Sequence, residues 1–242
     1  MSGGSSRNIT LSLFTDIDIS RWQIAGRLLD AIAGAIDGLR FDSADLGIKQ
    51  LALYDLDYSP LASDWQDSAV VVIGAKAPVP TDLIFTNSPS GITPRSIALT
   101  IGATYFGDPT RVANYVEMVA ELANLVGASY GRAHDTGDFL QLRKTSLPEV
   151  GEVALGIDLH RGLPGIYWLN VLGPSIIKRV GAERLRSASA MRQVDLPYGG
   201  VLLQMYTSPN EFDMAENRNA IKSLIDHVGS EAFDIPYPSW DG

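Results

Sequence analysis

An aspartate and a histidine two positions apart, Asp158 and His160, are the first residues of this chain whose spacing suggests chemistry. Side chains two residues apart in an extended strand point to the same face, so this pair could share a metal ion. Zinc sites use three or four protein ligands, and no further candidate ligand follows close by in the sequence. We therefore expect no metal site.

The other two histidines, His134 and His227, also lack the partners that catalysis needs. His134 stands in the polar stretch YGRAHDTGD, and His227 lies at the end of the last predicted helix, where it suits the helix dipole. The chain has no cysteine, no G-x-S-x-G nucleophile elbow and no G-x-x-x-x-G-K-[ST] phosphate loop. The sequence predicts neither catalytic residues nor a cofactor.

Charge is distributed more informatively. Lys and Arg number 19 against 28 Asp and Glu, which gives a net charge of -9. This balance argues against nonspecific binding of nucleic acid or an anionic membrane, because neutralising phosphates requires an excess of cations. No apolar run is long enough to span a bilayer, and no signal peptide is recognised, so we expect a cytoplasmic protein.

One segment is acidic and another is basic. No Lys or Arg occurs between Lys49 and Lys76, whereas residues 178–192 carry five cations and one acid. Acidic side chains beside aromatic anchors are typical of surfaces that capture cationic proteins, although a solvated loop that keeps the protein soluble has the same composition. The candidate partner-binding residues are Asp55, Asp57, Tyr58, Asp64, Trp65 and Asp67.

Hydrophobic periodicity predicts the elements that position these residues. Residues 9–14, 50–56, 69–74, 96–106 and 197–209 read as strands. A helix is expected after a capping box formed by Ser20 and Gln23, a second from Asp108 to Gly127, and a third after a capping box formed by Asp213 and Glu216.

These elements predict an α+β fold, in which long helices pack on a mostly antiparallel sheet and strand-helix units recur. Residues 1–8 are expected to be a flexible N-terminus. Residues 9–242 would form a single domain, either undivided or built from two packed halves that divide near the proline-rich residues 76–96.

The stretch GIYWLNVLGP, residues 165–174, has two interpretations. Alternation places Ile166, Trp168 and Asn170 on one face of a strand and Tyr167 with its alternate neighbours on the other. The first interpretation is a buried scaffold strand that ends at Gly-Pro. The second is a ligand pocket around Tyr167 and Trp168, with His160 as a further lining residue, in a small-molecule-binding protein or enzyme.

The same stretch, followed by SIIKRVG and then PYGGVLLQMY, resembles the bacterial immunity protein 52 family and related immunity proteins of type VI secretion. The resemblance covers residues 163–235. It implies a non-catalytic protein that binds a cognate toxin domain, often a nuclease, and neutralises it by direct contact. It implies no particular contact residues, because the matching motifs are apolar. A third possibility is a structural subunit of a secretion apparatus.

Overall fold

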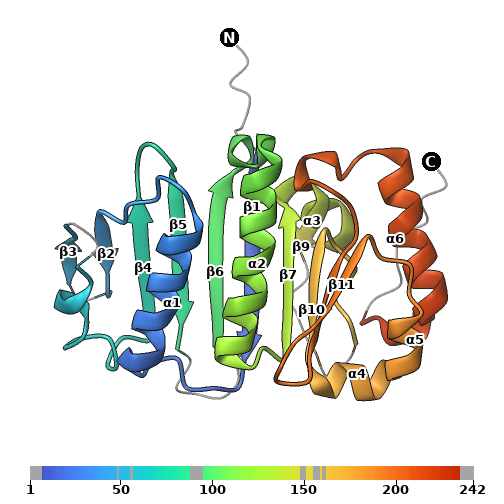
Figure 1. Cartoon of the computed structure of the whole chain (residues 1–242), viewed down its shortest axis with the longest axis horizontal. Coiled ribbons are helices and arrows are strands. Elements are labelled where there is room, and N and C mark those ends of the chain that lie inside the picture. The colour runs from blue at the N-terminus through green and yellow to red at the C-terminus, as the bar shows by residue number, and fades with distance from the viewer. Residues whose placement is uncertain are drawn as a thin grey trace, which may run out of the picture.

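A computed structural model describes residues 7–47, 49–54, 57–87, 95–147, 151–154, 159 and 162–234. In these residues, ten strands form one sheet whose neighbouring strands are all antiparallel, in the order β11-β12-β10-β7-β1-β6-β5-β4-β2-β3 (Figure 1). The strands are β1 (Asn8–Thr15), β2 (Ser43–Asp45), β3 (Gln50–Ala52), β4 (Val70–Ala75), β5 (Thr81–Thr86), β6 (Arg95–Gly102), β7 (Tyr130–Asp135), β10 (Leu169–Leu172), β11 (Arg192–Asp195) and β12 (Val201–Gln204). A separate hairpin pairs β8 (Lys144–Leu147) with β9 (Gly151–Ala154).

Six α-helices accompany the sheet in the described ranges. They are α1 (Trp22–Ala35), α2 (Pro109–Val126), α3 (Thr136–Arg143), α4 (Pro174–Val180), α5 (Ala182–Arg186) and α6 (Ala215–Val228). The predicted combination of helices with a large antiparallel sheet is confirmed. A regular repetition of strand-helix units is not, because β2 and β3, and later β4, β5 and β6, follow one another without an intervening α-helix.

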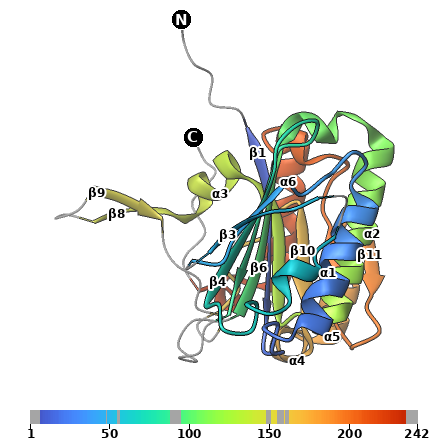
Figure 2. The same cartoon turned by 90° about the vertical axis from the view of Figure 1, so that its left-hand side faces the viewer.

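The central strand β1 shows why one face of the sheet is covered by helices. Its alternate residues Ile9, Leu11 and Leu13 are fully buried, whereas Thr10 and Phe14 on the opposite face are only partly buried. Helices α1 and α2 pack against each other and lie side by side on the apolar face (Figures 1 and 2). Strands from both sides of the proline-rich residues 76–96 pair in this sheet, β1 with β7 among them.

The ends of the helices only partly follow the predicted signals. Helix α2 begins as expected, where the Asp108 carboxylate accepts a hydrogen bond from the Thr110 backbone N–H at 2.8 Å, and it ends at Gly127 in the left-handed conformation. The capping box predicted for α1 is wrong, because the Ser20 hydroxyl donates to Asp18 instead. The box predicted for α6 is also wrong: its first residue follows Met214, which provides no side-chain cap.

Three predicted strands are shorter in the structure. The strand expected over 50–56 contains only Gln50–Ala52, and the one expected over 96–106 ends at Gly102, where a 3-10 helix, Ala103–Gly107, leads into α2. The strand expected over 197–209 contains only Val201–Gln204, and the Gly-Gly pair before it forms the turn from β11.

The second face of the sheet is covered unevenly. At the β11-β12 end, α4 and α5 pack on it, whereas at the opposite end side chains such as Asp82 and Val72 stay exposed or partly exposed. Figure 2 shows α3 and the β8-β9 hairpin projecting from this second face, opposite α1 and α2. The uncovered end is therefore accessible.

Candidate protein-binding surface

A shallow groove lies on the uncovered end of the second face. Strand register places Ser43 of β2 opposite Gly74 of β4, and Gly74 opposite Asp82 of β5, so their side-chain positions share this face. The groove has a volume of about 820 Å³. A side chain at Gly74 would meet the Ser43 hydroxyl at 2.9 Å, so glycine keeps the floor of the groove open. We call this feature the acidic groove. Its lining residues are Asp42, Ser43, Ala44, Asp45, Gln50, Leu51, Ala52, Leu53, Tyr54, Val72, Gly74, Lys76 and Asp82.

Three carboxylates and one ammonium group line the acidic groove. Asp45 accepts hydrogen bonds from the Gly47 backbone N–H at 2.7 Å and from the Gln50 side chain at 3.1 Å, and these bonds lower its pKa. Asp42 accepts from the Lys76 backbone N–H at 3.1 Å. The Asp82 side chain is exposed and makes no hydrogen bond or ion pair within the described ranges. It is the carboxylate of the groove that is most available to a partner.

An exposed tyrosine borders the acidic groove. The Tyr54 side chain is 73% exposed, which makes it the most exposed large hydrophobic residue among those described. It follows β3, which pairs only with β2 in the part of the chain that the structure describes and so forms one edge of the sheet. An accessible ring beside carboxylates is the combination expected of a protein-binding surface.

The aromatic members of the predicted set are core residues instead. Trp65 is fully buried: its indole N–H donates to the Ile19 carbonyl at 3.1 Å, and its ring packs between Trp22 of α1 and Phe85 of β5. Tyr58 is 5% exposed, and burial raises its pKa to about 12. Both residues anchor the loop after β3 on the helix-covered face, so neither ring is accessible to a partner in this conformation.

The predicted acidic residues lie apart from one another. Asp55 lies outside the described residues, and Asp57 is exposed with its pKa lowered by hydrogen bonds from Ser59. Asp64 forms an ion pair with Lys49 at 2.9 Å, and Asp67 borders a separate hollow that also contains Asp18 and Arg95. The structure therefore brings Asp57 near Tyr54, through a backbone bridge, but does not gather the set into the acidic groove.

The acidic groove could not be predicted from the sequence, because its carboxylates come from separate segments. Asp42 directly precedes the short strand β2, Asp45 is its last residue, and Asp82 stands some forty residues further along the chain in β5. One signal was present: Asp82 is the single charge in TDLIFT, at a position that alternation assigns to the face opposite Leu83 and Phe85. Only the register shows that the three residues share one hollow.

A buried charged cluster joins the core to α3 and α6. Arg218 of α6 donates to the Asp138 carboxylate of α3 at 2.6 Å, and burial raises the pKa of Asp138 to about 6 despite this cation. Arg132 of β7 lies 4.3 Å from the Phe139 ring centroid, in a cation–π contact. Burial lowers the pKa of the neighbouring His134 to about 3, so this imidazole is neutral at physiological pH. The cluster fixes α3, from which the β8-β9 hairpin projects.

The aromatic pair proposed to line a ligand pocket is packed in the core. Trp168 stacks on Tyr115 of α2 and donates to the Tyr206 carbonyl at 2.9 Å, whereas Tyr167 lies beside His134 on the opposite side of the sheet. The prediction that Trp168 and Asn170 share a face is wrong. The strand begins only at Leu169, because the Asn170 side-chain amide forms hydrogen bonds with both the N–H and the C=O of Tyr167. Before Leu169 the side chains therefore do not alternate between the two faces of the sheet.

The histidines and acids form no metal site in the described ranges, where no group of three or more His, Cys, Asp or Glu residues is placed to hold an ion. Asp158 and His160 lie outside those ranges. His227 contacts the Ser187 hydroxyl at 3.0 Å and the Arg184 carbonyl at 2.8 Å, and so joins α6 to α5. Within the same ranges, no helix has the length and apolar character that crossing a membrane requires.

Comparison with known proteins shows the fold. No protein-family model and no curated protein matches the chain, so the resemblance to the immunity protein 52 family stays a prediction. Among solved structures, the chain is similar to the T6SS protein PA0821 of Pseudomonas aeruginosa. The TM-score is 0.54 at 12% sequence identity, over 90% of this chain and 76% of that chain. Because the sequence identity is this low, the similarity shows that the two proteins share a fold.

Proposed function

We propose that this protein binds a toxin domain of an interbacterial competition system, a basic nuclease, and neutralises it by direct contact without catalysis. The observation that carries the proposal is that Asp42, Asp45 and Asp82 line one open groove beside the exposed Tyr54. The shared fold with a T6SS protein supports a role in type VI secretion.

The charge of the acidic groove suits a basic partner. Three carboxylates and only one ammonium group line it, and the whole chain carries a net charge of -9. A nuclease that binds DNA needs a cationic surface, and opposite potentials accelerate the encounter of two proteins. Tyr54 supplies the desolvated aromatic contact that commonly dominates the energy of such an interface.

The shape of the acidic groove favours one of two modes of inhibition. A protruding acidic loop would enter the DNA-binding cleft of the toxin and take the place of phosphates. A hollow instead receives a protruding basic segment of the toxin, which places the inhibitor outside the cleft and holds the toxin in an inactive conformation. The concave geometry of the groove supports the second mode.

The first experiment co-expresses this chain with the protein encoded beside it and scores survival of a host that the neighbouring protein alone kills. Co-purification at moderate salt then tests for a complex. Two variants probe the groove, Asp82→Lys and Tyr54→Ala, since both side chains are exposed. The matched control is Asp213→Lys, an exposed acid before α6 that changes the charge equally.

Rescue with a stoichiometric complex is expected, and Asp82→Lys should weaken binding at least about tenfold while Asp213→Lys does not. Survival without a complex would indicate an enzymatic antidote and overturn direct binding. If Asp82→Lys and Asp213→Lys bound equally well, the protein could still neutralise the toxin by direct contact, but the acidic groove would not be the surface that binds it.

A further inference from the structure

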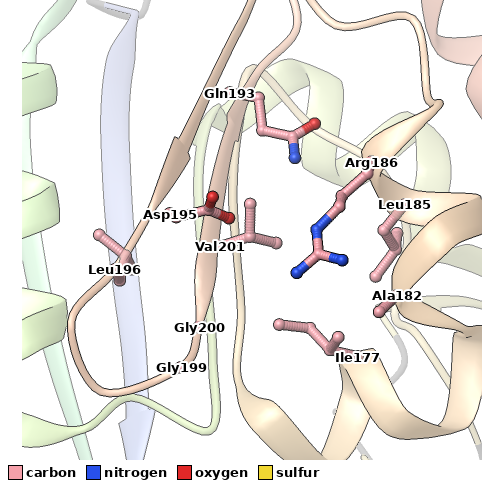
Figure 3. Close-up of a pocket in the computed structure, with 10 residues that line it drawn as sticks. All are labelled: Ile177, Ala182, Leu185, Arg186, Gln193, Asp195, Leu196, Gly199, Gly200 and Val201. Carbon is pink, nitrogen blue, oxygen red and sulfur yellow. The ribbon is translucent and has the colours of Figure 1, made fainter.

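Another hollow lies at the opposite edge of the sheet from the acidic groove, between the β11-β12 hairpin and helices α4 and α5 (Figure 3). Its volume is about 240 Å³, below the roughly 300 Å³ at which sites for small molecules begin, so it suits a single side chain. Ile177, Leu185 and Val201 line it with apolar atoms. Figure 3 shows the Arg186 guanidinium pointing into the hollow, with Asp195 on the opposite wall. We call it the edge pocket.

Strand β11 beside the edge pocket has an unoccupied side. It pairs only with β12 within the described ranges, as the last strand of the sheet order. The Leu196 N–H donates to the Gly200 carbonyl at 2.8 Å, and in an antiparallel ladder every second residue bonds inward. Val194 therefore bonds to β12, whereas the backbone N–H and C=O groups of Gln193 and Asp195 point outward.

The outward backbone groups and the edge pocket belong together. The side chains of Gln193 and Asp195 line the pocket, and those of Arg192 and Val194 face the other side, where Arg192 pairs with Glu117 of α2. A strand added to β11 would form hydrogen bonds with the backbone of Gln193 and Asp195. The residue of the added strand that lies directly opposite one of these would have its side chain on the same face as the pocket. Edge pairing would thus direct a side chain toward the pocket.

We propose that β11 is a docking edge for an extended segment of another protein, which inserts an apolar side chain into the edge pocket and sets a carboxylate against Arg186. This site is separate from the acidic groove and does not depend on the proposed function. It lies at the opposite edge of the sheet and takes a segment of opposite charge.

One cation, Arg186, and one acid, Asp195, line the edge pocket, and Arg186 is the group that would attract an acidic segment. Arg184 pairs with Glu231 and Arg192 with Glu117, but the Arg186 side chain makes no ion pair or hydrogen bond within the described ranges. Lys178 on α4 is likewise an exposed cation without an ion pair there. Met191, 52% exposed and directly before β11, extends the apolar contact along the edge.

A second copy of this chain fits the edge pocket poorly. If two β11 strands paired with each other, the residues on the pocket face would again be Gln193 and Asp195, which are polar. Neither would fill an apolar pocket, and two Arg186 side chains would then face one interface. The pattern of β11 therefore favours a different protein as the occupant.

The test uses the full chain and a set of fluorescent peptides. Each peptide is a threonine-rich extended stretch with two variable positions, spaced two residues apart so that both side chains share a face. Leucine or alanine occupies one position, and glutamate or lysine occupies the other. Fluorescence anisotropy measures affinity, and hydrogen exchange reports protection of the Gln193 and Asp195 amides.

The leucine-glutamate peptide is expected to bind and to protect both amides. Replacing its leucine by alanine should weaken binding about tenfold, and methylating the peptide amide that pairs with β11 should abolish it. The Arg186→Glu variant should reverse the preference from glutamate to lysine. Arg111→Glu, an equal charge change at a partly exposed position of α2, should leave the preference unchanged.

Three results would overturn the proposal. One is that no peptide of the set binds, and another is that Arg186→Glu keeps the preference for glutamate. The third is a concentration-dependent dimer that protects the β11 amides in the absence of peptide. Because Arg186 is exposed, the Arg186→Glu variant is expected to fold. Circular dichroism of the variant checks that a loss of the preference for glutamate is not caused by unfolding.

Discussion

Arg218 of α6 donates a hydrogen bond of 2.6 Å to the carboxylate of Asp138 in α3, and both side chains are largely buried, at 13% and 0% exposure. This pair joins elements that lie 80 residues apart in the sequence. It fixes the base of the β8-β9 hairpin against the C-terminal helix.

Arg218→Met is expected to destabilise the protein by about 3 kcal/mol at pH 7.5, because it leaves a buried carboxylate without its cation. At pH 5 the loss should be smaller, since Asp138, whose pKa is already raised to about 6, is then mostly protonated. Urea unfolding at both pH values measures the difference. Arg111→Met, which removes an exposed pair with Asp37, is the control and should cost less than about 1 kcal/mol. An equal loss at both pH values would argue against the pair.

His134→Gln is expected to protect the protein against acid. The pKa of His134 falls from 6.5 to about 3 in the folded state, so the stability it contributes is complete above pH 6.5 and is lost as the pH falls toward 3. The raised pKa of Asp138 has the opposite sign: its contribution is complete below pH 3.8 and is lost as the pH rises through 6. In the His134→Gln variant the pH dependence due to Asp138 remains, and it makes the protein more stable as the pH falls.

Unfolding free energies at pH 6.5 and 4.5 measure this effect. Wild type should lose up to about 2 kcal/mol more than the variant between these values, at roughly 1.4 kcal/mol per pH unit for one group. Parallel losses in the two proteins would show that His134 is protonated in the folded state.

Asn170→Leu should destabilise the protein by about 2–4 kcal/mol. The Asn170 side chain accepts from the Tyr167 N–H at 2.9 Å and donates to the Tyr167 carbonyl at 2.8 Å, and leucine removes both bonds in a buried site. Asn114→Leu, at an exposed position of α2, should change stability by less than about 0.5 kcal/mol. Thermal unfolding of the two variants measures the contrast, and a similar melting temperature for both would contradict it.

Trp65→Phe should lower stability by about 2 kcal/mol and leave partner association unchanged. Phenylalanine loses the hydrogen bond to Ile19 and leaves part of a fully buried site unfilled. Chemical unfolding and association kinetics with the co-purified partner separate the two effects. If a folded Trp65→Phe variant associated more slowly, Trp65 would belong to the interface with the partner.

Two double variants with the same change of charge locate the steering surface. Asp42→Asn with Asp82→Asn should slow association with the partner about tenfold at low salt, and the difference should shrink as salt rises. Asp64→Asn with Asp67→Asn alters residues outside the acidic groove and should slow it less. Stopped-flow kinetics at several salt concentrations measure both, and the reverse order would assign steering to the segment from Asp57 to Asp67.

The predictions from local pattern succeeded where one short segment determines the structure. Asp108 caps the start of helix α2 and Gly127 caps its end, as predicted, because the cap and the left-handed glycine act within a few residues. The capping boxes at Ser20 and Asp213 failed because other residues compete for the same groups, as Asp18 does for the Ser20 hydroxyl. Strand lengths failed at Ala52 and Gly102, where pairing ends before the apolar pattern does.

By itself, the sequence determined the antiparallel class of the fold, the apolar faces of α1 and α2, and the excess of acidic residues, because composition and periodicity act along the chain. Only the tertiary structure decided which charges meet. Register across three strands assembles Asp42, Asp45 and Asp82 in one groove, and packing against Trp22 and Phe85 withdraws Trp65 into the core. Such groupings depend on distances between segments far apart in the sequence, which no local pattern encodes.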